Sequence, residues 1–250
     1  MKMLKFFLYS LQTFLLIIPG IRPFIKWIYD RTMRPYKNRQ RNQEFLRDSP
    51  GLIRAAKNAF DEIGVVYWIE FGTLLGAERH QDLISHDLDV DFGMFLNDYD
   101  AEHEKIFKKY GLRKVREILV DDGMFAREET YIFGEATMDI FYFKQRKNGL
   151  CCTYSFLPEE GSSYDYTIEK YGGLRVLEEC VICEGFGEAV LQGIVFPAPE
   201  PKGEHLRALY GENYMIPNPD WVIDTKGPYR RFITEKTGIR FYHNGGHRYV

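Results

Sequence analysis

The chain has 250 residues and is 45% hydrophobic and 16% aromatic, which is enough for one sizeable buried core and allows one or two domains. Charged residues make up 28% of the chain, and this balance excludes an intrinsically disordered protein. The formal net charge of −3 argues against a general nucleic-acid binder, because such proteins usually carry a strongly basic face.

The amino-terminal segment, residues 1–41, differs in charge from the rest of the chain. It holds nine Lys or Arg residues and one acid, Asp30, for a net charge of +8, which leaves −11 for the remainder. Its apolar run from Phe6 to Ile18 has 13 residues, whereas a spanning helix needs about 20. We therefore expect an amphipathic, membrane-associated helix that contacts anionic headgroups and places the body on the cytoplasmic face of a membrane, peripheral or N-terminally anchored. Packing of this helix on the body or on a partner subunit is the alternative.

The body, residues 42–250, is expected to form one domain with a loop-rich carboxyl-terminal portion. Ser49-Pro50 predicts a helix start, and apolar residues at helical spacing continue as far as Gly64, a natural helix stop. A β-branched and aromatic run over 65–71 predicts a strand. This strand is expected to break at Gly72-Thr73, where a short helix opens.

The next part of the chain predicts mainly strands. Alternation over 89–95 predicts a strand, and a helix capped by Asp100 and ended by Gly111 follows. We expect further strands at 112–120, 124–133, 136–143 and 149–156, a strand pair near 174–196, a stiff connector at Phe196-Pro-Ala-Pro199, a helix over 204–210 and then a wrapping tail. This order predicts an α+β fold with a small mixed β-sheet flanked by helices.

Four cysteines, Cys151, Cys152, Cys180 and Cys183, are too few and too irregularly placed for a secreted disulfide scaffold. They could supply thiolates to a structural zinc ion, but adjacent cysteines on a strand point to opposite faces. Buried apolar thiols are the favoured interpretation.

Three aspartates, Asp87, Asp89 and Asp91, stand at alternate positions in an otherwise apolar stretch. On a strand they would project to one face, about 6.5–7 Å apart for each two-residue step. Carboxylates at such a short distance repel each other unless a cation lies between them, and hard ions such as Mg²⁺ prefer carboxylate oxygens. The pattern predicts a site for Mg²⁺ or Mn²⁺. A helix-loop-helix calcium site is excluded, because Phe92 and Asp98 occupy the places of its Gly and Glu.

A solvated acidic strand face is the simplest alternative, but it leaves two features unexplained. Gly72-Thr73 lies where a strand turns into a helix, so a phosphate could approach the backbone there and bind the helix N-terminus and the Thr73 hydroxyl. Asp139 is a further aspartate inside an apolar strand. Arg79 and His80 follow one helix length after the turn, and a guanidinium can bind phosphate in bidentate fashion. An ion pair of Arg79 with a neighbouring acid is equally compatible with the sequence.

The stretch from Gly72 to Asp91 resembles the LicD/fukutin family of nucleotidyltransferase-fold phosphotransferases. The likeness is carried by Gly72-Thr-Leu-Leu-Gly76-Ala-x-Arg79-His80, then Leu83-Ile84, then Asp87-x-Asp89-Val-Asp91. Asp139 resembles the third carboxylate of that fold, on a neighbouring strand. The stretch Leu206-x-x-Leu209-Tyr210-Gly211 to Pro217 is similar to the family's downstream Tyr-Gly segment. Ser85-His86 departs from the family, many members of which have Pro-Trp or Pro-Tyr there.

The resemblance implies a nucleotidyltransferase-like fold and a metal-dependent transfer of phosphocholine, or of another phosphorylated alcohol or sugar. The donor would be a CDP-alcohol, and the acceptor a glycan or lipid-linked glycan of the lipopolysaccharide or teichoic acid type. Asp89, Asp91 and Asp139 would be the catalytic metal ligands, with Asp139 either a ligand or the group that takes the acceptor's proton. The implied substrate-binding residues are Gly72, Thr73, Arg79, His80 and Asp87.

Two other functions remain open from the sequence. A glycosyltransferase could use an Asp-x-Asp metal site on a nucleotide-sugar, although Gly72-Thr73 would then have no set role. A membrane-docked, non-catalytic binding protein is the second alternative, and carboxylates held within apolar strands argue against it.

Overall fold

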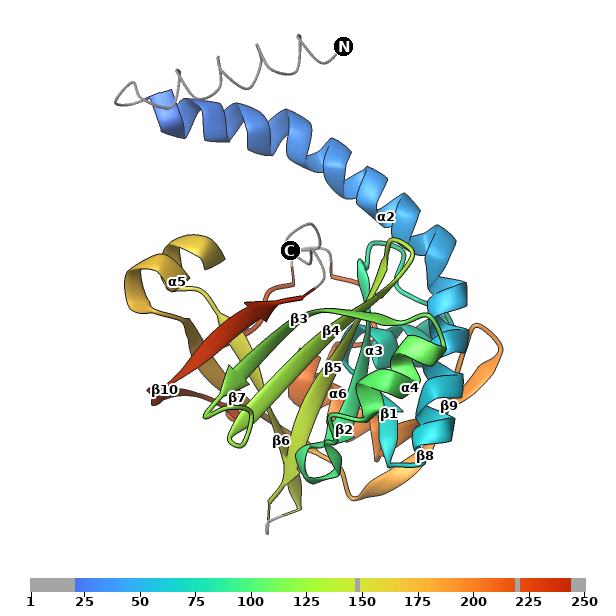
Figure 1. Cartoon of the computed structure of the whole chain (residues 1–250). Helices are drawn as coiled ribbons and strands as arrows, with labels where there is room; N and C mark the ends of the chain where they lie inside the picture. Colours follow the sequence, from blue (N-terminus) through green and yellow to red (C-terminus); the bar gives the residue numbers. More distant parts are fainter. Residues whose placement is uncertain (1–20, 147–148, 219–220, 244–250) are drawn as a thin grey trace. The chain divides into compact units, whose positions relative to one another are not determined.

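The computed structural model describes residues 21–146, 149–218 and 221–243, and its contacts divide the chain into two compact units, 1–44 and 45–250. In the first unit, the described residues all belong to helix α2 (Ile21–Ile63) (Figure 1). Residues 1–20, which carry most of the expected amphipathic helix, lie outside the described part. Among the helices of the described residues, none has both the length and the apolar character needed to cross a membrane.

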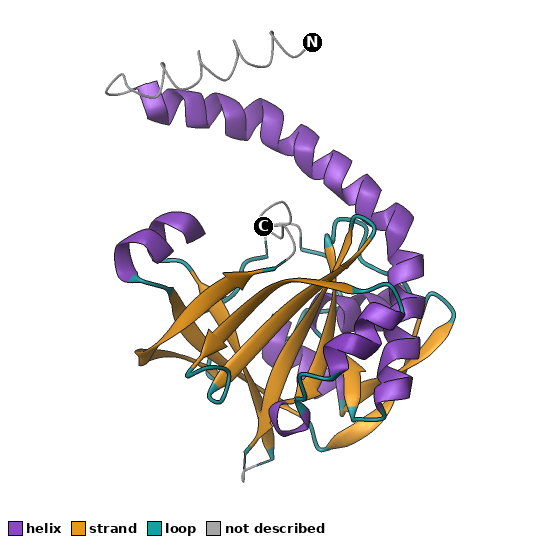
Figure 2. Cartoon of the chain, viewed as in Figure 1, coloured by secondary structure: helices purple, strands orange, loops and turns teal. Residues whose placement is uncertain are grey.

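The second unit contains helices and strands together, which confirms the α+β class (Figure 2). After α2 its elements are β1 (Tyr67–Ile69), α3 (Phe71–His80), β2 (Asp89–Phe95), η1 (Leu96–Asp98), α4 (His103–Lys109), β3 (Arg113–Val120), β4 (Ala126–Phe133), β5 (Ala136–Gln145), β6 (Leu150–Leu157), α5 (Tyr164–Tyr171), β7 (Leu174–Ile182), β8 (Gly185–Leu191), β9 (Ile194–Glu200), α6 (Lys202–Tyr210) and β10 (Arg230–Tyr242).

The main sheet has eight strands in the order β1-β2-β5-β4-β3-β10-β7-β6, so the small sheet predicted from the sequence was an underestimate. An additional pairing joins β6 back to β5, and the strands from β5 to β6 therefore form a closed ring. Strands β2 and β5 are parallel, whereas the other pairs are antiparallel. Strands β8 and β9 form a separate two-stranded sheet.

Helix α2 does not begin at Ser49-Pro50 as predicted, but continues through both residues. Proline has no N–H to donate to the carbonyl four residues earlier, here that of Leu46. The Ser49 hydroxyl instead donates to the Leu46 carbonyl oxygen over 3.4 Å. The predicted stop at Gly64 is confirmed, because Gly64 has a φ of +76° and its N–H bonds to the Phe60 carbonyl.

The carboxyl-terminal part of the structure differs from the predictions in three respects. The expected connector Phe196-Pro-Ala-Pro199 lies within β9, which among the described strands pairs with β8 alone and so tolerates proline on its other edge. Helix α5 was not predicted, although Ser163 caps it by accepting from the Tyr166 N–H. The expected wrapping tail forms strand β10, which pairs with β3 on one side and β7 on the other.

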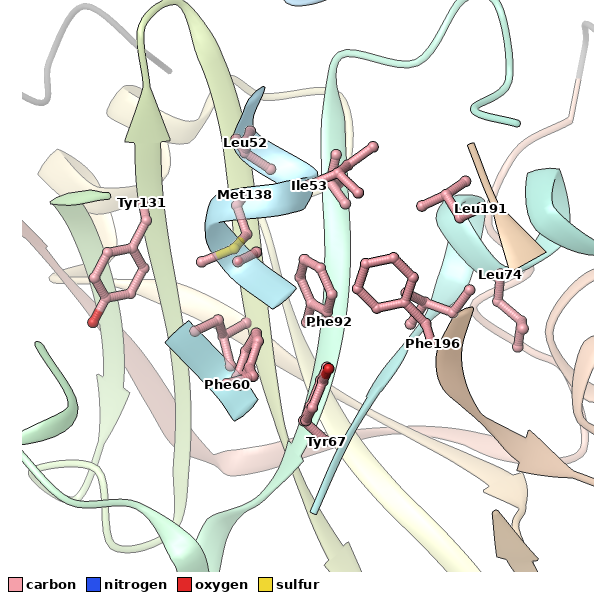
Figure 3. Close-up of a cluster of buried hydrophobic side chains, with 14 of the residues drawn as sticks. Leu52, Ile53, Phe60, Tyr67, Leu74, Phe92, Tyr131, Met138, Leu191 and Phe196 are labelled. Atoms are coloured by element: carbon pink, nitrogen blue, oxygen red, sulfur yellow. The ribbon is translucent and has the colours of Figure 1, made fainter. Parts of the chain in front are cut away.

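The largest core cluster packs the helices against one face of the sheet (Figure 3). Val90, Phe92 and Met94 of β2 are fully buried in it. From α2, Phe60 stacks on Tyr67 with ring centroids 4.3 Å apart. Because side chains alternate along a strand, burial of this set directs the aspartates of β2 to the opposite face.

The four cysteines do not form a common metal site. Cys152 and Cys180 face each other across β6 and β7 and are joined in a disulfide, whereas Cys151 and Cys183 are buried free thiols. The expectation of buried thiols is therefore confirmed for Cys151 and Cys183 and wrong for Cys152 and Cys180.

Asp48 of α2 ties that helix to the turn between β4 and β5. Its Oδ2 accepts from the Glu135 backbone N–H at 2.8 Å, and the hydrogen bonds from Arg47 and from this N–H lower its pKa to about 2. We expect Asp48→Ala to reduce the free energy of unfolding by about 1 kcal/mol at pH 7. A lowered pKa stabilises the fold above the unfolded-state pKa, so the difference should shrink as the pH falls through about 4 towards 2.

Urea unfolding at pH 7 and pH 3 measures this difference. Glu135→Ala is the matched control, because it removes an exposed side chain and leaves the bonded N–H in place. A difference between Asp48→Ala and wild type that stays constant with pH would contradict the assignment.

Candidate active site

Three carboxylates meet on the sheet face opposite the main core. Strands β2 and β5 run parallel in a register that places Asp91 beside Asp139, and Asp89 lies two residues before Asp91 on the same face. One carboxylate oxygen from each of the three lies within 4.8 Å of the others. The structure therefore brings together the three residues that the sequence predicted as metal ligands.

This arrangement is electrostatically unfavourable without a cation. Burial, together with the charges of Asp89 and Asp139, raises the pKa of Asp91 well above its ordinary value. A divalent ion among the oxygens would convert this repulsion into attraction. Three carboxylates at this spacing form an all-oxygen donor set, which fits Mg²⁺ or Mn²⁺.

Asp87 does not share the strand with the other two aspartates, because β2 begins at Asp89. It precedes the strand and faces Gly72, where an added Cβ would lie 3.1 Å from the Asp87 Oδ2. Burial raises the pKa of Asp87 to about 6. The predicted ladder of three aspartates on one strand face was therefore wrong in this respect, while the expected proximity of Asp87 to the glycine turn is present.

The carboxylate of Asp139 is oriented by two neighbours that the sequence analysis missed. The Thr130 hydroxyl donates to its Oδ1 at 2.5 Å, and Arg116 Nη2 lies 3.4 Å from its Oδ2. Arg116 also donates to Glu128 at 2.8 Å, and Glu128 is itself buried. Burial raises the pKa of Glu128 to about 7, against the opposing charge of Arg116.

The Gly72-Thr73 turn adjoins these carboxylates, as predicted. Helix α3 begins at Phe71, and Glu70 caps it by accepting from the Phe71 N–H at 3.1 Å. Thr73 is buried, and its hydroxyl oxygen accepts from the Asp91 backbone N–H at 2.8 Å. This bond connects the first turn of the helix to the strand that carries the aspartates.

Arg79 and His80 lie in the last turn of α3 and contact backbone carbonyls. The Arg79 guanidinium donates to the carbonyls of Tyr214 and Ile216, and His80 Nε2 lies 3.2 Å from that of Leu83. In this arrangement Arg79 secures a distant segment of the chain, and its contact with a phosphate stays a prediction.

A pocket of about 1020 Å³ opens beside the turn. Its lining joins Gly72, Arg79, His80 and Asp87 to Tyr210, residues 213–218 and Trp221. The downstream Tyr-Gly segment therefore forms part of the same cavity as four of the predicted substrate-binding residues.

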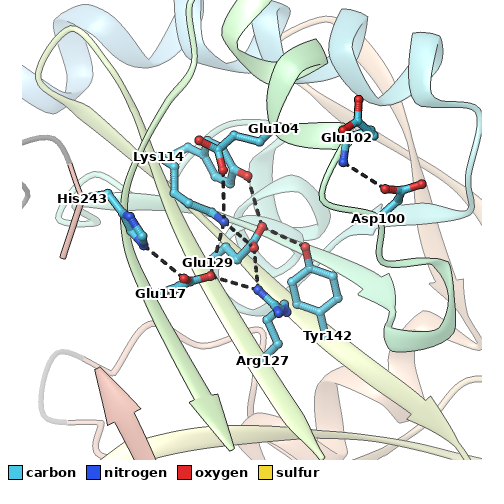
Figure 4. A network of polar contacts seen from close by, with 10 residues as sticks. Asp100, Glu102, Glu104, Lys114, Glu117, Arg127, Glu129, Tyr142 and His243 are labelled. Atoms are coloured by element: carbon cyan, nitrogen blue, oxygen red, sulfur yellow. Dashed lines mark hydrogen bonds and ion pairs between the residues drawn. The ribbon is translucent and has the colours of Figure 1, made fainter. Parts of the chain in front are cut away.

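A second polar cluster lies on the other face of β4 (Figure 4). Glu129 is buried and contacts Lys114 at 2.8 Å and Arg127 at 3.0 Å, and it accepts from the hydroxyls of Tyr131 and Tyr142. Glu129 and Thr130 are adjacent on the strand, so the two polar clusters face opposite sides of the sheet. The sequence signal was the polar run Arg127-Glu-Glu-Thr130 within a predicted strand, which indicates partners on both faces.

Comparison with known proteins finds relatives of the region that contains this site. Residues 64–179 match the family model described as "LicD/FKTN/FKRP, nucleotidyltransferase domain". The chain is 24% identical over 180 residues to human ribitol-5-phosphate transferase FKTN, across 71% of this chain and 35% of the relative. It is 39% identical over 72 residues to human ribitol 5-phosphate transferase FKRP, across 29% of this chain and 13% of that relative.

An uncharacterised protein of Rickettsia typhi, RT0683, is 40% identical over 134 residues, across 50% of this chain and 40% of the relative. The chain thus matches about a third of the length of the FKTN relative. The matched region contains Gly72, the aspartates of β2 and Asp139. The resemblance read from these residues is confirmed: residues 64–179 match the LicD/FKTN/FKRP family model.

Proposed function

We propose that this protein is a metal-dependent transferase that moves a phosphorylated alcohol from a CDP-alcohol donor to a hydroxyl group of a glycan. The observation that carries the proposal is the cluster of Asp89, Asp91 and Asp139 oxygens within 4.8 Å of one another, beside the first turn of α3. Support comes from the FKTN and FKRP relatives, which are named ribitol-5-phosphate transferases. Ribitol phosphate and phosphocholine are the first groups to consider.

In this proposal Asp89, Asp91 and Asp139 would hold Mg²⁺ or Mn²⁺, which supplies charge neutralisation for a diphosphate. Thr130 and Arg116 fix the orientation of the Asp139 carboxylate, which suits a ligand whose geometry must be maintained. The N–H groups of the Gly72-Thr73 turn face the donor's phosphates, because a helix N-terminus attracts anions. The pocket between α3 and residues 213–218 receives the rest of the donor.

The acceptor and the location are part of the same proposal. A glycan that is still attached to a lipid would be reached at a membrane surface. The basic residues of the segment 1–41 would bind that surface on its cytoplasmic side.

The test is to incubate the purified chain with CDP-ribitol, CDP-choline, CDP-glycerol or CDP-ethanolamine, with Mg²⁺ or Mn²⁺ and a glycan acceptor. The proposal expects release of CMP and a phosphodiester on the acceptor, both lost when EDTA is added. Release of a nucleoside diphosphate from a nucleotide-sugar, with a new glycosidic bond, would overturn it in favour of a glycosyltransferase. Metal binding without turnover of any donor in the panel would favour a non-catalytic binding protein.

A further inference from the structure

Two fully buried ionisable side chains lie behind the turn of α3 and are not among the predicted site residues. Glu70 follows β1, and His205 belongs to α6; each has 0% of its surface exposed. Their side chains meet at 2.7 Å between His205 Nε2 and Glu70 Oε1. Charged groups are almost never fully buried unless they are paired, and here the two side chains are each other's partner.

The hydrogen bonds around the pair specify its chemistry. Besides its contact with His205, the Glu70 carboxylate accepts hydrogen bonds from Trp68 Nε1 at 2.5 Å and from the Phe71 N–H at 3.1 Å. Only a carboxylate accepts at both ends, so glutamine could not satisfy all three donors. His205 Nδ1 lies 2.9 Å from the Ile182 carbonyl oxygen, which cannot donate, so Nδ1 carries a hydrogen.

Two lone pairs would face each other if Nε2 and Oε1 were both unprotonated, and a proton therefore lies between them. The charge of Glu70 and its hydrogen bond raise the pKa of His205 even though burial opposes this. The pair thus connects strand β1 to helix α6 through a proton held away from solvent.

The same carboxylate bonds to a strained piece of backbone. Phe71 has a φ of +45°, in the left-handed region that a bulky side chain rarely adopts. Strain of this kind persists only where surrounding contacts hold it, and the Phe71 N–H is bonded to Glu70. The backbone of Glu70 also contacts the carboxylate strand, because its N–H donates to the Asp91 carbonyl at 3.0 Å. The Asp91 N–H in turn donates to the Thr73 hydroxyl oxygen.

We propose that Glu70 and His205 are positioning residues that hold the turn at Gly72 and Thr73 against the carboxylate strand, and so shape the site for the donor's phosphates. This inference rests on the proposed function. The pair acts through the turn and through α6, whose last residue, Tyr210, lines the adjoining pocket.

The experiment compares Glu70→Gln and His205→Gln with wild type by calorimetric titration of Mn²⁺ alone and then of CDP in the presence of Mn²⁺. Mn²⁺ affinity should change by less than about twofold, because the three aspartates are untouched. CDP affinity should fall about 10- to 100-fold, the usual effect of losing a residue that orients a binding group. Matched controls are Glu135→Gln and His103→Gln, which alter an exposed glutamate and a histidine at the start of α4 and should bind CDP as wild type does.

Unchanged CDP affinity in both variants would overturn the inference. If wild type binds Mn²⁺ but not CDP, the proposed function fails instead. A measurement on wild type covers the case in which the variants do not fold: ¹⁵N NMR of the six histidines should show one ring with Nδ1 protonated and a slowly exchanging proton at Nε2. The absence of such a ring would remove the shared proton and the inference with it.

Discussion

Asp91→Asn is expected to abolish stabilisation of the protein by Mn²⁺ and to reduce transferase activity by roughly a thousandfold or more, because electrostatic stabilisation of the transition state is usually the largest catalytic contribution. Asp91 lies between the other two proposed ligands, with Asp89 on its own strand and Asp139 opposite. Asparagine has nearly the same shape but carries no charge. The metal-free variant should therefore be at least as stable as metal-free wild type, since burial and the neighbouring carboxylates raise the pKa of Asp91 and disfavour its charge.

Thermal unfolding with and without Mn²⁺, alongside CMP release, measures both effects. Asp122→Asn is the matched control: Asp122 is exposed and has a φ of +54°, which asparagine tolerates, so this variant should keep the full Mn²⁺ shift. An Asp91→Asn protein that Mn²⁺ stabilises as much as wild type would rule out the metal assignment.

Glu129→Gln is expected to reduce the free energy of unfolding by about 3 kcal/mol, because it removes one partner from a buried charge cluster. The side chains of Lys114 and Arg127 are only 7% and 8% exposed, so neither can regain full hydration when Glu129 loses its charge. The amide would also direct its N–H groups either at the two tyrosine hydroxyls or at Lys114 and Arg127, all of which now donate to the carboxylate.

Urea unfolding measures the change, with Glu135→Gln as the control because that exposed glutamate makes no side-chain ion pair among the described residues. A loss below about 1 kcal/mol would show that Glu117, which also contacts Lys114 and Arg127, compensates for the missing charge. The stated role of Glu129 would then be wrong.

The part of the fold that holds the candidate site was largely predictable from local sequence patterns. Strand β2 has the predicted bounds, because Asp89 and Asp91 alternate with fully buried Val90 and Phe92. The change from strand to helix near Gly72 was visible for a similar reason, although the predicted strand over 65–71 was too long: β1 ends at Ile69 and α3 begins at Phe71. Long-range proximity of Asp139 came from the family resemblance, and only the parallel register of β2 and β5 gives it a physical basis.

What could not be predicted depends on contacts between distant segments. Strand β10 has a weak alternation of exposed and buried residues, so its sequence gives little sign that two other strands cover its edges. Arg116 and Thr130 reach Asp139 from neighbouring strands, and their position depends on a strand order that local periodicity does not encode. The Glu70–His205 contact joins residues 135 positions apart, and neither residue lies in a recognisable motif.

The position of β10 also bears on how the polypeptide is made. Until residues 230–242 have emerged from the ribosome, β3 and β7 have no neighbour to complete the ring, and each presents a row of unsatisfied backbone groups. Ring closure during biosynthesis is therefore expected to be late, although the aspartates are synthesised early. A nonsense mutation shortly before position 230 should yield an aggregating product that retains every proposed metal ligand.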